Sequence, residues 1–225
     1  MDELFNEEKL DKLLRELSHY DATLVAVSKK HTVESIQAVY DHGHKIFGEN
    51  RVQELVQKQP ELPKDIEWHQ VGHLQTNKVK LVLPIATLTH SVDSERLLAA
   101  MNKEAGALGK VADCLLQIRI AREETKYGFI KNTLKALIEK GKLDDYPNLN
   151  IRGYMGIATQ TEDASQIRKE YKTLNKFFEE SQEDYKDKFP NFDILSMGMT
   201  DDHQIALDEG STMIRVGSAI FGPRD

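Results

Sequence analysis

The chain is poor in cysteine and has no long hydrophobic run, and both absences narrow what it can be. Its 225 residues include a single cysteine, Cys114, so an intrachain disulfide is excluded. Cys114 lies in an apolar run over 112–120, where we expect a buried structural thiol rather than a nucleophile. No apolar stretch approaches the length that spans a bilayer, so no membrane partner is predicted.

Clustered positive charge is missing as well. The 37 acidic and 30 basic residues give a net charge of -7, and no group of Lys and Arg resembles a phosphate-backbone footprint. We therefore expect no nucleic-acid partner. The eight histidines are scattered without the spacing of a zinc site, so no metal is predicted. The acidic start, MDEL, is unlike a signal or transit peptide, which favours residence in the cytoplasm.

What the chain does contain is a regular alternation of two kinds of segment. Short apolar or β-branched runs are typical of strands, and apolar residues at intervals of three and four are typical of helices. Strands are predicted over 23–29, 45–48, 67–71, 86–92, 112–120, 149–157, 192–197 and 213–216. Helices are predicted over 3–19, 32–42, from 49–51 onward, and over 74–83, 94–108, 131–140, 162–186 and 201–209.

Alternation of strands with helices predicts an α/β protein with a parallel sheet. Eight such units closing on themselves form a (β/α)8, or TIM, barrel, and the helix before the first strand is extra to that pattern. An open doubly wound sheet is the alternative, although no Gly-x-Gly-x-x-Gly turn follows the first strand. No linker or low-complexity segment interrupts the chain, so one domain over 1–225 is expected.

The first strand ends in a lysine. Side chains alternate across a strand, so Val25, Val27 and Lys29 share one face. If that face points into the barrel, Lys29 lies at the carboxyl end of the strand, where barrel enzymes hold their chemistry. A partly desolvated lysine amine loses its proton readily and can form a Schiff base. The alternative is a strand-ending lysine whose amine reaches water.

Two glycine-containing loops follow the seventh and eighth strands, where many barrels bind a phosphate. The segments 196–200 and 215–222 offer small residues, hydroxyl donors and a possible helix start after Ser218. The alternative is that these glycines only shape turns. Arg215 should point inward, and a buried arginine needs a partner, either a carboxylate or a ligand atom. A lysine, a phosphate-binding loop and an arginine together suggest pyridoxal phosphate.

Over nearly its whole length the chain resembles the pyridoxal phosphate homeostasis proteins, whose barrel is related to the N-terminal domain of alanine racemases. Several motifs spread along the sequence carry the resemblance. They are 26–29 (AVSK), 47–50 (FGEN), 52–54 (VQE), 67–69 (EWH), Gly72, 74–75 (LQ), 77–78 (NK), 152–153 (RG), Met155, Ile157, 195–199 (LSMGM), 201–202 (DD), 210–213 (GSTM) and 214–222 (IRVGSAIFG).

The resemblance implies a role for each of these candidate residues. It implies that Lys29 holds pyridoxal phosphate, a form of vitamin B6, as a Schiff base, and that Arg215 meets the pyridine nitrogen. It assigns the other cofactor contacts to Asn50, which faces the ring, to Ser196, Gly217 and Ser218, which serve the phosphate, and to the backbone amide of Met197.

The expected function is cofactor binding and handling rather than catalysis. Racemases of this fold add a second domain that supplies a tyrosine as the opposite base, and no length remains for it after Gly222, so no residue is assigned a catalytic role. An arginine on the pyridine nitrogen also weakens the electron sink. The expected partners are pyridoxal phosphate and apo-enzymes that use it, and a monomer is expected. The alternatives are a racemase of low activity and a Schiff-base aldolase for a sugar phosphate.

Overall fold

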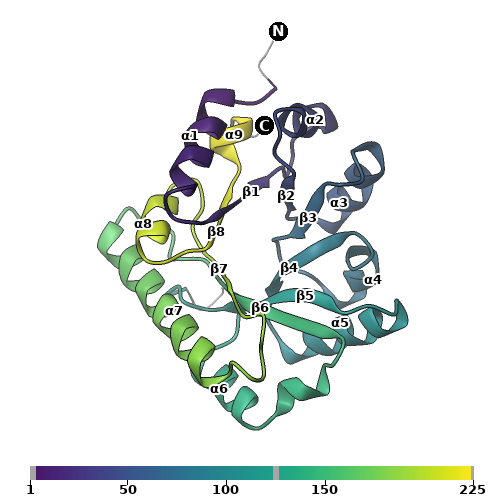
Figure 1. Cartoon of the computed structure of the whole chain (residues 1–225), viewed down its shortest axis with the longest axis vertical. Coiled ribbons are helices and arrows are strands. Elements are labelled where there is room, and N and C mark those ends of the chain that lie inside the picture. The colour runs from purple at the N-terminus through teal and green to yellow at the C-terminus, as the bar shows by residue number, and fades with distance from the viewer. Residues whose placement is uncertain (1–3, 124–126, 224–225) are drawn as a thin grey trace.

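Eight parallel strands close into a barrel in the computed structural model, which describes residues 4–123 and 127–223. Each strand pairs with the next along the chain, and the ring closes where β1 pairs with β8, Val25 opposite Arg215. The predicted (β/α)8 fold is confirmed (Figure 1). The strands are β1 (Thr23–Val27), β2 (Ile46–Glu49), β3 (Glu67–Gln70), β4 (Ala86–Val92), β5 (Ala112–Ile118), β6 (Leu149–Gly156), β7 (Ile194–Ser196) and β8 (Met213–Val216).

Helices surround the strands and cover the outer face of the barrel (Figure 1). Thr32 caps the helix after β1, as its sequence predicts, because its Oγ1 accepts from the Ser35 N–H. The α-helices are α1 (Glu7–Leu17), α2 (Val33–Asp41), α3 (Val52–Lys58), α4 (Val79–Val82), α5 (Glu95–Ala107), α6 (Lys131–Glu139), α7 (Ala164–Asp184), α8 (His203–Asp208) and α9 (Ser218–Phe221). Short 3-10 turns cover Gln59–Glu61, Thr76–Lys78 and Lys142–Asp145.

The element ends differ from the sequence predictions in several places. Glu49 belongs to β2, because its backbone pairs with Gln70, and the following helix begins only at Val52. The segment predicted as helix over 74–83 opens extended at Gln75 and passes through a 3-10 turn before α4. The seventh strand pairs over three residues, not six. The predicted start of the first helix at residue 3 lies outside the described residues.

The core has two layers that the barrel wall separates. Inside the barrel, inward side chains of β1, β4, β5, β6 and β8 form one cluster with Val71, which follows β3, and Val25 and Val27 belong to it as predicted. A larger apolar layer fills the space between the outer face of the strands and the helices. Cys114 is fully buried, and burial raises the pKa of its thiol to about 12, so it is an unreactive core residue. The wall therefore fixes the direction of the inward residues within the strands.

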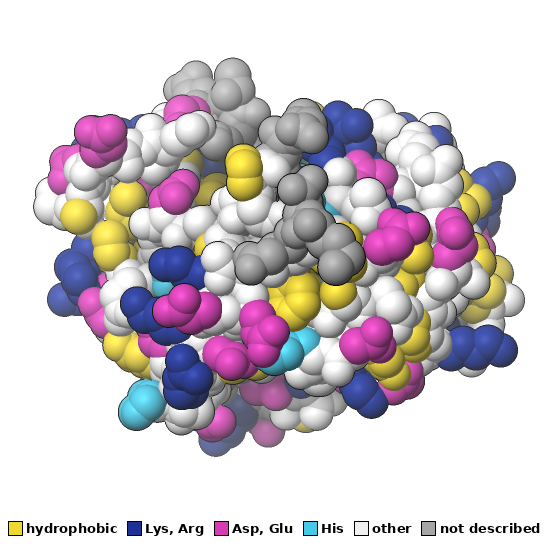
Figure 2. Space-filling model, turned by 90° about the horizontal axis from the view of Figure 1, so that it is seen from above, with side chains coloured by type: hydrophobic (Ala, Val, Ile, Leu, Met, Phe, Trp, Pro, Cys, Tyr) yellow, Lys and Arg dark blue, Asp and Glu magenta, His cyan; other side chains and the backbone are white. Residues whose placement is uncertain are grey.

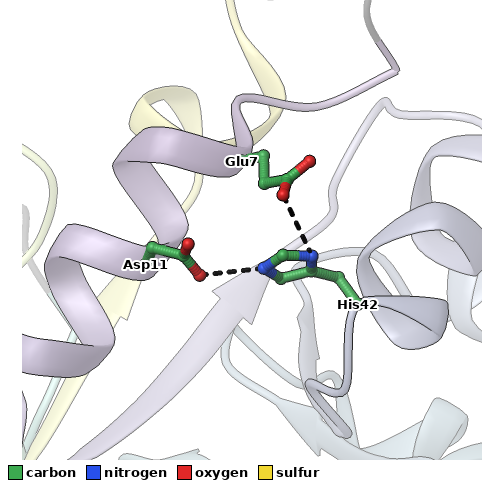
Figure 3. A group of neighbouring side chains, drawn as sticks. All are labelled: Glu7, Asp11 and His42. Atoms are coloured by element: carbon green, nitrogen blue, oxygen red, sulfur yellow. Dashed lines mark hydrogen bonds and ion pairs between the residues drawn. The ribbon is translucent and has the colours of Figure 1, made fainter.

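The extra helix α1 packs against α9, and the backbone N–H of Asn6 donates to the Ile220 oxygen (2.7 Å). A second contact of α1 is with His42, which lies just after α2 between two carboxylates of α1 (Figure 3). Nε2 lies 2.8 Å from Asp11 Oδ1, and Nδ1 lies 3.8 Å from Glu7 Oε1. The three groups lie close enough together to hold a metal ion, but the carboxylates face opposite ring nitrogens. This is the arrangement of an ion-paired imidazolium.

Acidic and basic side chains are interspersed on the face seen in Figure 2, without a continuous band of one sign. Over the described residues, no helix is both long enough and apolar enough to cross a bilayer.

Candidate functional site

A cavity of about 400 Å³ opens at the carboxyl ends of the strands. It brings together side chains from opposite ends of the chain, because β1 and β8 are neighbours in the closed ring. Of the predicted site residues, five line it, namely Lys29, Asn50, Arg215, Gly217 and Ser218. The strand phases deduced from the sequence therefore direct these residues to one place.

Lys29 lies two residues past the end of β1 and is half-buried. Val27, which shares its face of the chain, also lines the cavity, and Val25 lies deeper in the barrel interior. Ser28, which lies between Val27 and Lys29, points to the opposite face, where its Oγ donates to Glu49 Oε1 (2.7 Å). Lys29 thus reaches the cavity from the end of β1. The opposite face of this segment is held by the hydrogen bond between Ser28 and Glu49.

Arg215 extends from β8 into the bottom of the cavity and is 5% exposed. Its Nη1 donates to Ser196 Oγ (2.5 Å), and its Nη2 donates to the Gly156 oxygen (3.1 Å). Among the described residues, no carboxylate forms a salt bridge with it. Burial lowers the pKa of Arg215 from its usual value, yet an arginine stays charged at any physiological pH. A buried cation with only neutral direct partners favours a ligand that supplies an acceptor.

Ser196 connects Arg215 to two buried histidines inside the barrel. His90 Nδ1 lies 3.0 Å from Ser196 Oγ, and His90 Nε2 lies 3.0 Å from His69 Nδ1. Burial lowers the pKa of His69 to about 4 and, together with the charges of His69 and Arg215, that of His90 well below its usual value. Both rings are therefore neutral near pH 7, and one donates to the other. The series of hydrogen bonds from His69 through His90 and Ser196 to Arg215 fixes the plane of the guanidinium beneath the cavity.

The opposite end of the cavity carries hydroxyl groups. Thr200, in the loop after β7, and Ser218, after β8, both line it, and their Oγ atoms are 3.3 Å apart. Gly217 lines the wall beside them and, as a glycine, has no side chain between its backbone and the cavity. Two flexible hydroxyl donors next to a bare backbone are suited to an anion's oxygens.

The structure does not bring Ser196 and Met197 to this cavity. Ser196 is fully buried below it in the contact with Arg215 and His90. The Met197 side chain is also fully buried, and its backbone N–H donates to the Met213 oxygen (3.1 Å) within the sheet. The hydroxyl loop after β7 instead presents Thr200, four residues further along.

Asn50 lies between β2 and α3 and faces the cavity from the side of β3. The loop after β3 approaches it closely at Gly72, where a Cβ atom would lie 2.3 Å from the Asn50 oxygen. Only glycine fits at that position. Gln70 Nε2 donates to the backbone oxygens of Asn50 (3.2 Å) and Gly72 (3.0 Å), so the two loops are held together.

Comparison with known proteins gives a consistent result. The family described as alanine racemase, N-terminal domain, matches residues 7–225. A pyridoxal phosphate homeostasis protein of Aquifex aeolicus is 37% identical over 204 residues, covering 90% of this chain and 87% of its own. The Escherichia coli protein of the same name is 35% identical over 210 residues, covering 91% and 87%. The chain belongs to the pyridoxal phosphate homeostasis protein family.

Solved structures agree with the family assignment. PipY of Synechococcus elongatus superposes with a TM-score of 0.88 without pyridoxal phosphate and 0.85 with it bound. It is 35% identical, and the match covers 96% of this chain and 99% of that one. An alanine racemase of Clostridium difficile, 15% identical with a TM-score of 0.70, shares the fold, and the match covers 95% of this chain but 55% of the racemase.

Several residues of this family member's cavity were not predicted from the sequence. His73 lines the cavity, its Nδ1 lies 2.9 Å from Asp93 Oδ2, and its ring stacks on Tyr127 at 3.8 Å between centroids. Gln117 lines it from β5 and donates to the Tyr127 backbone oxygen (3.2 Å). The alternation of β4 and β5 contains the signal for His90 and Gln117, since each lies two residues after an inward leucine, Leu88 or Leu115.

Proposed function

We propose that this chain binds pyridoxal 5'-phosphate and serves to hold and hand on that cofactor. The observation that carries the proposal is the convergence of Lys29, Arg215 and the Thr200–Ser218 hydroxyl pair on one cavity. The relatives' name and the cofactor-bound PipY structure support it.

The donor set fits the three anchoring groups of the cofactor. Lys29 supplies a primary amine for the aldehyde, and Arg215, which lacks an ion-paired carboxylate among the described residues, retains N–H groups for the pyridine nitrogen. Thr200 and Ser218 supply hydroxyl donors for the phosphate beside the open backbone at Gly217. Asn50 remains a proposed contact on the ring. A cavity of about 400 Å³ suits a ligand of this size.

When bound, the cofactor supplies an electrophilic aldehyde and an electron-withdrawing ring. Lys29 Nζ forms a bond to the aldehyde carbon, and its two protons leave with the carbonyl oxygen as water. Arg215 donates a hydrogen bond and holds a positive charge at the ring nitrogen, which keeps a proton off that atom. Because an unprotonated ring is a weak electron sink, this arrangement favours retention of the cofactor over carbanion chemistry.

Reversible covalent holding suits a protein that stores a reactive aldehyde. An incoming primary amine would take the place of Lys29 on the aldehyde carbon: its nitrogen bonds to that carbon, the bond to Lys29 Nζ breaks, and its two N–H protons pass to Nζ, which is left as a free amine. We propose that apo-enzymes dependent on pyridoxal phosphate receive it, and that the exchange takes place in the cytoplasm.

The decisive experiment uses Lys29→Ala. The wild-type protein should absorb visible light after addition of pyridoxal phosphate, and borohydride should fix the cofactor on Lys29, as located by peptide mass spectrometry. Lys29→Ala should lose the reducible adduct and retain its fold, because the half-buried side chain leaves little cavity behind. Lys80→Ala, at an exposed position of α4, is the matched control. An adduct on Lys30 or Lys78 would contradict the proposal.

A racemase of low activity is the second candidate, favoured by one observation. His73 faces the cavity and is oriented by Asp93, so the site contains a possible second base besides Lys29. Incubation of the loaded protein with L-alanine in deuterated water tests it. If the pair moves a proton at the α-carbon, D-alanine accumulates and His73→Gln lowers the rate about 100-fold. Absence of D-alanine and of deuterium exchange would reject this candidate.

A further inference from the structure

A buried cluster of charges lies behind the turn that carries Lys29. Lys58 Nζ donates to the Ser28 backbone oxygen (2.9 Å), to Glu49 Oε1 (2.7 Å) and to Glu54 Oε2 (3.0 Å). The exposed fractions of the three charged side chains are 10% for Lys58, 0% for Glu49 and 17% for Glu54. Burial of charged groups opposes folding. A buried charged cluster therefore indicates a role that apolar side chains at the same positions do not fill.

The cluster contacts both neighbours of Lys29 in the chain. Ser28 to His31 form a tight turn, in which the His31 N–H donates to the Ser28 oxygen (3.1 Å). Lys30, the third residue of the turn, has a φ of +66°, in the left-handed region that glycine favours. Its backbone N–H donates to Glu54 Oε2 (2.6 Å). One carboxylate thus holds the residue after Lys29 in a strained conformation, while Lys58 holds the residue before it.

Glu54 is negatively charged in this cluster. Burial raises the pKa of Glu54, but the hydrogen bonds from the Lys30 N–H and from Lys58 outweigh it, and the pKa lies below its usual value. Glu54 is therefore an anion at neutral pH. Neither Glu54 nor Lys58 lines the cavity, so neither touches a ligand bound there.

We propose that Glu54 and Lys58 are positioning residues that fix the turn and thereby aim Lys29 Nζ at the carbonyl carbon of the ligand. The inference rests on the proposed function of Lys29. Strain at a non-glycine residue persists only where surrounding contacts maintain it, and such strain is typical of functional sites. Without the Glu54 contact, the backbone at Lys30 relaxes, and the amine samples orientations away from the cavity.

The first measurement is the rate of covalent reaction with pyridoxal, which lacks the phosphate and so isolates the step at Lys29. Reaction is followed by borohydride trapping and mass spectrometry of the Lys29 peptide. Glu54→Gln should slow it about tenfold, since a misaligned reacting group loses rate steeply. Glu183→Gln, an exposed carboxylate on α7, should react at the wild-type rate. A wild-type rate in Glu54→Gln would overturn the proposal.

A double-mutant cycle separates positioning from a general structural role. The dissociation constant for pyridoxal phosphate is measured by calorimetry in four proteins, the wild type, Glu54→Gln, Lys29→Ala and the double variant. If Glu54 acts through Lys29, Glu54→Gln weakens binding in the wild-type background and has no effect once Lys29 is absent. Equal weakening in both backgrounds would mean a distorted cavity and would also overturn the proposal.

Thermal unfolding by circular dichroism confirms that each variant is folded. If Glu54→Gln does not fold, Lys58→Arg replaces it, because it keeps the positive charge but not the compact ammonium that meets three acceptors. It should likewise slow trapping at Lys29, and a wild-type rate would refute the positioning role. Absence of any adduct on Lys29 in the wild-type protein would instead refute the proposed function, and with it this inference.

Discussion

At the scale of single residues, the wall around Gly217 is where a small change should affect the cavity most. Gly217→Val places an isopropyl group beside the hydroxyls of Thr200 and Ser218, where the phosphate is proposed to bind. The backbone at Gly217 (φ -124°, ψ -73°) lies outside the main regions for a β-branched residue, so circular dichroism is used to select conditions in which the variant is folded. The dissociation constant for pyridoxal phosphate, measured by fluorescence titration, should rise about 10- to 100-fold through loss of charge-assisted hydrogen bonds.

Ala107→Val is the control for this prediction, because it adds the same group at an exposed position at the end of α5. It should bind with wild-type affinity. Unchanged affinity in Gly217→Val would place the phosphate elsewhere, and the loops after β7 and β8 would then have another role.

The sequence predicted the direction of a side chain where strand phase alone decides it. Alternation places Lys29 and Arg215 on the inward face, and both line the cavity. Alternation does not predict, however, how deep in the barrel an inward side chain lies. Ser196 is inward but lies one layer lower, so it contacts Arg215 and His90 while Thr200 reaches the cavity. The positioning contacts of Glu54 were beyond prediction because they depend on how α3 packs against the turn after β1.

At the scale of elements, the contact of α1 with α2 through His42 should depend on pH. The hydrogen bond with Asp11 raises the pKa of His42 above its usual value of 6.5. Because the pKa of His42 is higher in the folded state than in the unfolded state, the ion pair contributes its full stability below about pH 6.5. That contribution is lost as the pH rises through the folded-state pKa of His42. Asp11→Asn should therefore lower the melting temperature by about 1–2 °C at pH 5.5 and by less at pH 9, since an exposed pair contributes little.

His42→Gln is the companion variant, and differential scanning fluorimetry across the pH range is the measurement. In the His42→Gln background, Asp11→Asn should change the melting temperature equally at pH 5.5 and pH 9, because the imidazole that titrates is absent. A larger loss at pH 9 than at pH 5.5 in Asp11→Asn alone would contradict the assignment of an ion-paired imidazolium (Figure 3).

Element type was predictable where the periodic pattern is long, and element ends were not. The strands Ala86–Val92 and Met213–Val216 have the predicted bounds, because apolar and β-branched residues begin and end with the ladder. Glu49 reads as a helix start in the sequence, yet it completes β2, where Lys58 and Ser28 donate to its carboxylate Oε1 inside the fold. Such a partner, nine or more residues away, is invisible to a local pattern.

At the scale of the whole molecule, the monomer remains a prediction. The large apolar residues that are exposed include Val111, Ile130 and Met199, which lie in three different loops along the chain. An obligate dimer needs a larger continuous apolar surface. Light scattering during size-exclusion chromatography should give a mass close to the chain mass of 25.7 kDa at micromolar concentration. A mass of twice that value would contradict the prediction.

The closure of the barrel by β1 and β8 has a consequence for the protein's synthesis. The residues proposed to meet the cofactor lie far apart in the sequence, so that Lys29 is made well before Arg215 and Ser218. At 5–20 residues per second, roughly 10–40 s separate them on the ribosome. During that interval the lysine exists without the strand that completes its surroundings. A nascent chain that lacks β8 therefore should not capture the proposed cofactor with full affinity before Arg215 and Ser218 have been made.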